Sequence, residues 1–70
     1  MAGIQVEIRI VGAVPAELLE ELAGVEVIRQ TMETVLQGSL ADQAALIGMI
    51  NRLQGLGVEL REVRQLAPGT

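Results

Sequence analysis

One stretch limits the possible folds more than any other, residues 35–60, with the sequence VLQGSLADQAALIGMINRLQGLGVEL. Its apolar residues change their spacing along the way. In the middle they recur at three- and four-residue steps, the period of an amphipathic helix. These apolar positions are Leu46, Met49, Ile50, Leu53 and Leu56. The stretch predicts a strand, a tight turn, a helix ended by glycine and a second strand.

The predicted helix begins with a capping signal. Ser39 and Asp42 have the S-x-x-D spacing of a capping box, in which each side chain bonds the backbone of the other residue. Gly38 would form the turn before it, and either Gly55 or Gly57 can take the left-handed position at the helix end. A helix N-terminus can also bind an anion, but the two caps would use the same donors. We therefore favour structural capping by Ser39 and Asp42.

The first strand and helix are also marked by spacing. Ile4, Val6, Ile8 and Ile10 alternate with polar residues, the period of a half-buried strand, and Glu7 and Arg9 lie on its other face. Pro15 suits the first turn of a short helix over residues 15–23. The following glycine, Gly24, is a natural end for this helix.

Residues 25–37 allow two interpretations. Their apolar residues fit a helical spacing, yet many are β-branched and favour strands. They form either a hairpin with its turn near Thr31 and Met32, or a third helix. A last strand then begins near Val58, and its alternation slips at Val63, which indicates a bulge or an outward apolar residue. Leu66 would again point inward.

The motif L-x-G-x-x-x-D-Q-A-A-L-x-G, followed by N-R-L and L-G-V-E-L, resembles a family of small uncharacterised bacterial and archaeal single-domain proteins. The resemblance implies a ferredoxin-like βαββαβ fold and favours the hairpin. We expect an α+β domain over residues 1–70, with an ordered core over about 3–66 and a flexible tail at 67–70. Its four-stranded antiparallel sheet would have the order 4-1-3-2, with both helices on one face. Relatives often carry His in place of Ile47, and aromatic residues in the first half. No activity is established for the family.

Composition removes most catalytic chemistry. The chain has no Cys, His, Lys, Phe, Trp or Tyr, so it lacks the usual bases, thiolates and stacking rings. Its net charge of −4 argues against a nucleic-acid partner. The sequence shows no signal-peptide pattern and no apolar run long enough to cross a membrane, so we expect a cytoplasmic location. We expect no enzyme activity and no catalytic, cofactor-binding or metal site.

Three further features have ordinary structural explanations. The neighbouring carboxylates Glu20 and Glu21, and Glu59 and Glu62, fit solvated faces better than an acid–base pair. Gly48 inside the helix suggests close packing, although a ligand-facing notch is the alternative. The sheet arginines would pair with Glu7, Glu59 and Glu62 across strands rather than hold an anion. These arginines are Arg9, Arg29, Arg61 and Arg64.

Apolar content suggests association between chains. Half of the residues are hydrophobic and the mean hydropathy is +0.44, which is more than a domain of this size can bury. We predict a homo-oligomerisation or protein-interaction module, a dimer or higher oligomer at micromolar concentration. The interface candidates are Glu7 and Arg9 on the sheet face, Ile47 on the helix edge, and Val63. The alternative is a small-molecule-binding regulatory domain with a pocket between subunits.

Overall fold

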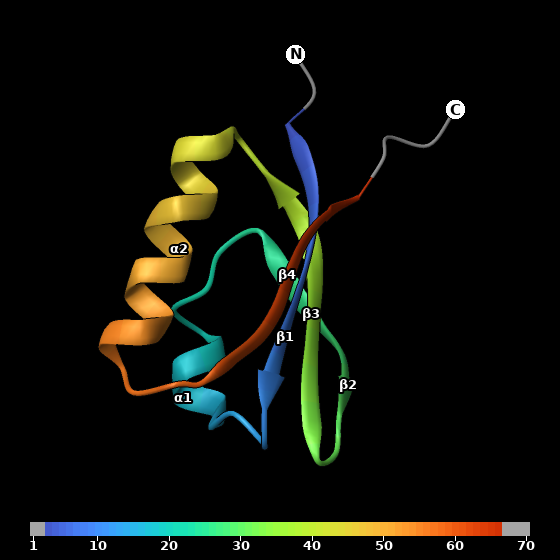
Figure 1. Cartoon of the computed structure of the whole chain (residues 1–70), viewed down its shortest axis with the longest axis vertical. Helices are drawn as coiled ribbons and strands as arrows, with labels where there is room; N and C mark the ends of the chain where they lie inside the picture. Colours follow the sequence, from blue (N-terminus) through green and yellow to red (C-terminus); the bar gives the residue numbers. More distant parts are fainter. Residues whose placement is uncertain (1–2, 67–70) are drawn as a thin grey trace.

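The computed structural model describes residues 3–66, which form two layers. A four-stranded antiparallel sheet forms one layer, and two helices lie on one of its faces (Figure 1). The α+β class with four antiparallel strands and two helices is therefore confirmed. The predicted tail at 67–70 lies outside the described residues. The elements are β1 (Ile4–Val11), α1 (Ala16–Leu19), β2 (Val25–Gln30), β3 (Glu33–Leu40), α2 (Gln43–Gly55) and β4 (Leu60–Leu66).

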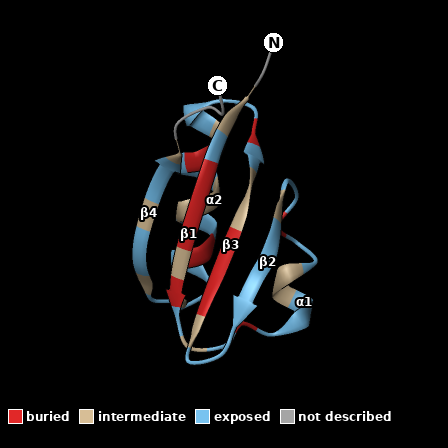
Figure 2. Cartoon of the chain, turned by 90° about the vertical axis from the view of Figure 1, so that its right-hand side faces the viewer, coloured by how far each residue is buried: buried red, intermediate tan, exposed pale blue. Residues whose placement is uncertain are grey.

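The core forms where β1 lies under the helices. The strand order is β2-β3-β1-β4, so β1 pairs on both sides, with β3 and with β4. Its alternating residues Val6, Ile8 and Ile10 are at most 1% exposed, as their period predicted. The ribbon coloured by burial shows buried segments on β1 and β3 between the mostly exposed β2 and β4 (Figure 2). Burial in the sheet is therefore greatest in its two central strands.

Residues 25–37 form the hairpin, and the alternative helix is wrong. β2 and β3 pair antiparallel, and Thr31 and Met32 connect them at the predicted turn. Distant pairing accounts for this outcome, because β3 also pairs along its whole length with β1. In that register Leu36 lies opposite Ile8, and both side chains are completely buried. A third helix would forgo this contact.

The N-terminus of α2 is capped by one residue rather than by the predicted pair. Asp42 is the N-cap, and its Oδ1 accepts the backbone N–H of Ala45 at 2.9 Å. Ser39 is still part of β3, where it lies opposite Gln5. The Ser39 cap is therefore wrong, because β3 continues to Leu40 and leaves Ser39 before the helix begins.

Gly38 also lies inside β3 and not in the predicted turn. A Cβ atom built there would lie 2.0 Å from the Gly24 carbonyl oxygen and 2.5 Å from the Val25 Cα. The segment that follows α1 crosses β3 at this point, and the Ser39 N–H donates to the Gly24 carbonyl at 3.0 Å. Glycine is required here because two backbones meet.

The apolar stripe of α2 is only partly buried. Leu46 and Leu53 belong to the core, whereas Leu56 at the end of the helix is 51% exposed. Among the described residues Gly48 shows no close packing, since a Cβ atom there would meet nothing within 4 Å beyond its chain neighbours and the helix's own backbone. The predicted close packing at Gly48 is wrong.

The short helix and the last strand differ from their predicted bounds. α1 has one turn of four residues instead of 15–23, although Leu22 beyond its end is buried. β4 starts at Leu60, two residues after Val58. Opposite β1, Val63 pairs with Ile8 and Leu60 pairs with Ile10, so Arg61 is the extra residue of a bulge.

The bulge determines on which face of the sheet the apolar residues of β4 lie. Val63 packs against the core, so the slip in alternation marks the bulge and not an outward residue. Leu66 lies opposite Gln5, on the face that the helices leave open. The prediction that Leu66 points inward is wrong, because Gln5 is on the polar side of β1.

Candidate functional site

The open face of the sheet carries an interlocked set of charged side chains centred on Glu7. One oxygen of the Glu7 carboxylate accepts hydrogen bonds from Arg9 Nε at 2.9 Å and from Arg64 Nη2 at 3.1 Å. The other oxygen accepts from Gln37 Nε2 at 2.7 Å. These four residues come from β1, β3 and β4, which are adjacent in the sheet. Glu7 is only 5% exposed as a result.

Hydrogen bonding fixes the charge of this carboxylate. Side-chain hydrogen bonds from Gln37, Arg64 and Arg9, in that order of importance, lower the pKa of Glu7 from 4.5 to about 2. The hydrogen bond and charge of Glu7 raise the pKa of Arg9 in turn. Glu7 is therefore ionised at neutral pH and unsuited to act as a general acid.

Glu33 forms a second centre on the same face. Its carboxylate lies 3.1 Å from Arg9 Nη1, 3.2 Å from Arg29 Nη2 and 3.5 Å from Arg61 Nε. The predicted cross-strand ion pairs are confirmed for Glu7 and Glu62, but Glu59 is in none of the ion pairs of residues 3–66. Sequence reasoning missed Glu33 because its position depends on the register of β3 against β1, which places it opposite Val11.

These ion pairs make two of the four predicted interface residues weaker candidates for contact with a second chain. Glu7 and Arg9 already have partners in their own chain, so neither needs a second copy to balance its charge. Ile47 is 56% exposed on the outer side of α2, as predicted for leftover apolar surface. Val63 is half-buried against the core. The structure does not bring these four residues together.

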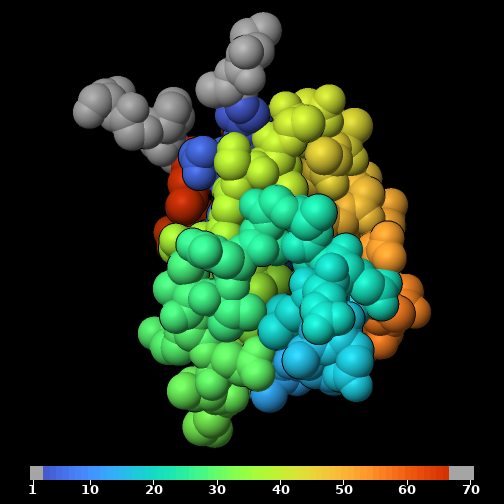
Figure 3. Space-filling view, turned by 180° about the vertical axis from the view of Figure 1, so that it is seen from behind, coloured from blue at the N-terminus to red at the C-terminus, as the bar shows by residue number. Residues whose placement is uncertain are grey.

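β2 is an edge strand of the sheet, and it exposes more large apolar side chains than the other edge strand, β4. Within residues 3–66, β2 pairs with β3 alone, and five of its six residues are exposed. Exposed apolar side chains sit side by side at Val27 and Ile28, which are 39% and 50% exposed. The space-filling view from behind shows this strand at the surface (Figure 3). Exposed strand edges of this kind offer unpaired backbone groups to another strand.

A bulge in β2 determines which side chains share a face. Val27 lies opposite Leu36 and Arg29 lies opposite Val35, so Ile28 is the extra residue. Glu26, opposite Gln37, and Arg29 therefore both project on the open face of the sheet. A regular strand would put residues three apart on opposite faces.

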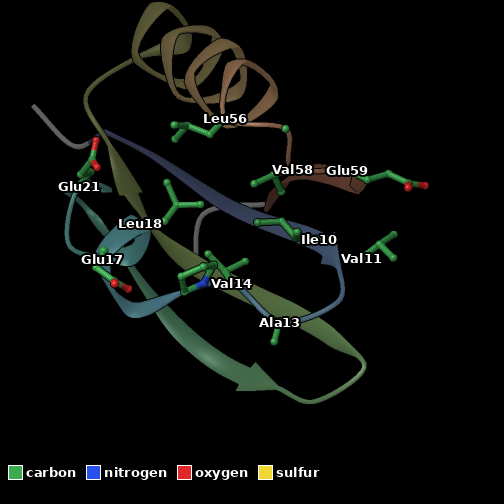
Figure 4. A pocket seen from close by; sticks show the side chains of 12 residues that line it. Ile10, Val11, Ala13, Val14, Glu17, Leu18, Glu21, Leu56, Val58 and Glu59 are labelled. Atoms are coloured by element: carbon green, nitrogen blue, oxygen red, sulfur yellow. The ribbon is translucent and has the colours of Figure 1, made fainter.

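A groove opens on the helix side of the molecule. It lies between α1 and the segment that links α2 to β4, over the end of β1, with a volume of about 640 Å³. The close view shows Ile10, Leu18, Leu56 and Val58 directed toward its centre (Figure 4). α1, a single turn of four residues, contributes Glu17 and Leu18 to its lining.

Comparison with known proteins gives a family but no activity. A family model described as a domain of unknown function, DUF8691, matches residues 5–64. The chain belongs to the DUF8691 family. The matched residues run from β1 to β4, so the family domain includes all four strands of the sheet. No curated protein and no solved structure matches the chain.

The remaining candidate carboxylates of this DUF8691 domain lie at the surface. Glu20 and Glu21 are exposed, as are Glu59 and Glu62. Within residues 3–66, no group of three or more carboxylates is placed to hold a metal ion. None of the helices in this part of the chain is long and apolar enough to cross a membrane.

Proposed function

We propose that this domain is a non-enzymatic homo-oligomerisation module, and that two copies pair through their β2 edges. The observation that carries the proposal is the self-complementarity of the exposed strand VEVIRQ. Two copies placed antiparallel about a two-fold axis between Val27 and Ile28 bring Glu26 opposite Arg29 of the second copy, twice. The axis itself is flanked by Val27 of each copy facing Ile28 of the other.

The bulge makes this charge pairing possible. Because Ile28 is the extra residue, Glu26 and Arg29 project from the same face of β2. An antiparallel partner related by a two-fold axis keeps that face in common, so opposite charges meet across the junction. Cross-strand pairs of opposite charge each stabilise a sheet by about 0.2–1 kcal/mol. Among the described residues Glu26 has no ion-pair partner, and it is free to accept one.

The other edge of the sheet is less suited to pairing. β4 exposes charged residues that pair within their own chain: Glu62 lies 3.2 Å from Arg64, and Arg64 lies 3.1 Å from Glu7. On β2, Arg29 lies 3.2 Å from Glu33 of its own chain, so among the described residues Glu26 is the charge of β2 that has no partner. None of the large exposed hydrophobic side chains of residues 3–66 is on β4, whereas two are on β2. Charged edges of this kind are a common protection against strand pairing.

The fold that supports this function is proposed to be of the ferredoxin-like βαββαβ type. The order of elements along the chain and the strand order β2-β3-β1-β4 support this assignment, as does the motif around Asp42. A non-enzymatic role is supported by a sequence without Cys, His, Lys or Tyr. Pairing through β2 would join two sheets into one of eight strands, with the helices of both copies on the same face.

Light scattering behind a sizing column tests the proposal, with refractive-index detection because the chain has no aromatic residue. We expect the native chain to elute as a dimer at micromolar concentration and Ile28→Asp to elute as a monomer. Ile47→Asp is the matched control, since Ile47 has a similar exposure of 56% but lies on α2, and it should remain dimeric. A dimer that survives Ile28→Asp and dissociates in Ile47→Asp would move the interface to the helix.

Charge exchange tests the register itself. Glu26→Arg and Arg29→Glu should each be monomeric alone, because each places like charges opposite one another. Their equimolar mixture should restore a dimer that contains one copy of each variant, since every facing pair is then of opposite sign. Native mass spectrometry distinguishes this heterodimer by mass. A mixture that stays monomeric while Ile28→Asp abolishes the native dimer would retain the β2 edge but reject this register.

A further inference from the structure

The groove beside α1 has the dimensions and surface of a small-molecule site. Its volume of about 640 Å³ falls within the ~300–1,000 Å³ typical of such sites. It is formed by three segments that are distant in the sequence: the end of β1 with the following loop, α1, and the loop from α2 to β4. It lies on the helix side of the sheet, so it does not include the β2 edge.

Apolar side chains form the interior of the groove. Leu18 approaches from α1, Leu56 and Val58 from the opposite wall, and Ile10 and Val14 from beneath (Figure 4). Leu56 is 51% exposed although it belongs to the apolar stripe of α2. A ligand with a hydrocarbon body would cover this side chain and remove apolar surface from water.

The charged residues of the groove all have one sign. Glu17 and Glu21 lie on the α1 side and Glu59 on the β4 side, and no arginine lines the groove. Glu21, just after α1, is paired with Arg52 of α2 at 2.6 Å. Glu17 and Glu59 have no ion-pair partner among residues 3–66.

The wider distribution of charge favours a cation at the same place. Four of the five arginines take part in the ion pairs of the open sheet face, and of the described residues only Arg52 carries a positive charge on the helix side. The helix side therefore holds the excess of negative charge, which attracts cations and repels anions. The acidic side chains on that side are Glu17, Glu20, Glu21, Asp42 and Glu59.

We propose that this groove binds a small molecule with an apolar body and a protonated amine. The hydrocarbon part would lie against Leu18, Leu56 and Val58, and the ammonium group would lie at the acidic rim near Glu17. A groove of about 640 Å³ suits a compact molecule. This proposal does not depend on dimerisation through β2.

Three eight-carbon probes of different charge test the proposal directly. n-Octylammonium, n-octanol and n-octanoate share one hydrocarbon chain and differ only in the polar group. Each is titrated into the ¹⁵N-labelled full chain at neutral pH, the two ionic probes below their micelle concentrations and n-octanol below its solubility limit. Backbone amide shifts are followed by NMR. We expect saturable shifts at the groove residues and a Kd for n-octylammonium at least fivefold below that for n-octanoate.

Two variants with matched controls locate the site. Leu56→Arg places a cation inside the groove and should abolish n-octylammonium binding, whereas Ile47→Arg, on the exposed side of the same helix, should leave it unchanged. Glu17→Gln should weaken n-octylammonium about twofold to fivefold without changing n-octanol, and Glu20→Gln, outside the groove, should change neither. Circular dichroism confirms that each variant is folded.

The opposite results would overturn the proposal. These are no saturable shift up to millimolar n-octylammonium, equal affinity for n-octanoate, or shifts centred away from the groove. Unchanged n-octylammonium affinity in both Leu56→Arg and Glu17→Gln would also overturn it. Repeating the titration with Ile28→Asp separates this test from the proposed dimer, because the groove should bind equally in a monomer.

Discussion

Glu7 is a carboxylate placed where an apolar side chain would be the simpler choice. It lies on the central strand and is almost fully covered, yet the covering groups are the side chains of Arg9, Gln37 and Arg64 rather than another layer of the protein. A buried charge is tolerated only when it is paired and hydrogen-bonded, and removing its partners is strongly destabilising. The open face of the sheet thus has a polar network that links β1, β3 and β4.

The lowered pKa of Glu7 predicts a specific dependence of stability on pH. The folded state holds the Glu7 proton less tightly than the unfolded state, because its pKa falls from 4.5 to about 2 on folding. The contribution of Glu7 to stability is therefore complete above about pH 4.5 and is lost as pH falls from there toward 2. In Glu7→Gln this contribution is absent at every pH.

Urea unfolding followed by circular dichroism at a fixed protein concentration measures the effect. The difference in unfolding free energy between the native chain and Glu7→Gln should be largest at neutral pH and should shrink as pH falls from 4.5 to 2. Glu20→Gln, at an exposed carboxylate, is the control and should show no comparable change. A difference that stays constant over this range would contradict the role of Glu7.

For the individual residues, the sequence predicted the β1 side of the polar network but not the β3 side. The strict alternation of residues 4–10 is enough to place Glu7 and Arg9 on one face of β1. Their partners Gln37 and Glu33 come from β3, 30 and 24 residues away along the chain. Their positions depend on the register of β3 against β1, and the sequence contains no local signal for that register.

Gly38 and Gly48 differ in the space available for a side chain. Gly38 lies in β3 where a Cβ atom would lie 2.0 Å from a backbone oxygen, whereas Gly48 lies in α2 with open space around it. Gly48→Ala should stabilise the domain by about 0.5–1 kcal/mol, since alanine favours the helix and meets no obstacle. Gly38→Ala should destabilise it by about 1–3 kcal/mol or more, because the backbones must move apart.

Urea denaturation midpoints of the two variants, compared at equal protein concentration, give both signs in one experiment. Each variant adds the same methyl group, so the pair controls for the chemistry of the substitution. A destabilising effect of Gly48→Ala would mean that another part of the protein occupies the space beside α2. A neutral effect of Gly38→Ala would contradict the close crossing of Gly24 over β3.

Elements with a strong period were predicted better than their ends. β1 and α2 were found from spacing alone, because a period-two or helical pattern reflects one buried face. Ser39 has the right spacing to Asp42 for a capping box, but pairing of β3 with β1 continues through Ser39 and moves the cap to Asp42. α1 ends after one turn, and Leu22 is buried although it lies beyond the end of the helix.

For the whole molecule, the two proposed binding surfaces lie in different layers and arise in different ways. The strand VEVIRQ is local, but its self-complementarity also depends on the bulge at Ile28, which puts Glu26 and Arg29 on one face. The groove joins residues from 10 to 59, and no local pattern predicts it. The groove has a negative charge because four of the five arginines lie on the open sheet face, so the helix side is left acidic.

Native-state hydrogen exchange should show which elements of the domain open first and which open last. β1 pairs on both sides and carries the core residues Val6, Ile8 and Ile10, so its amides should exchange only on global unfolding. α1 has one turn, no buried residue within its bounds and no side-chain cap, so its amides should exchange fastest of the helical ones. Two-dimensional NMR at a fixed protein concentration resolves both groups.

Hydrogen exchange of the β2 amides also tests the proposed dimer. A strand paired on one side leaves alternate N–H groups facing away from its neighbour, and in a monomer these exchange freely with solvent. In the native chain at dimer-forming concentration the outward amides of β2 should be protected, and dilution or Ile28→Asp should remove that protection while β1 stays protected. Outward amides that exchange freely in a chain shown to be dimeric would contradict pairing through β2, because backbone hydrogen bonds between the two strands must protect them.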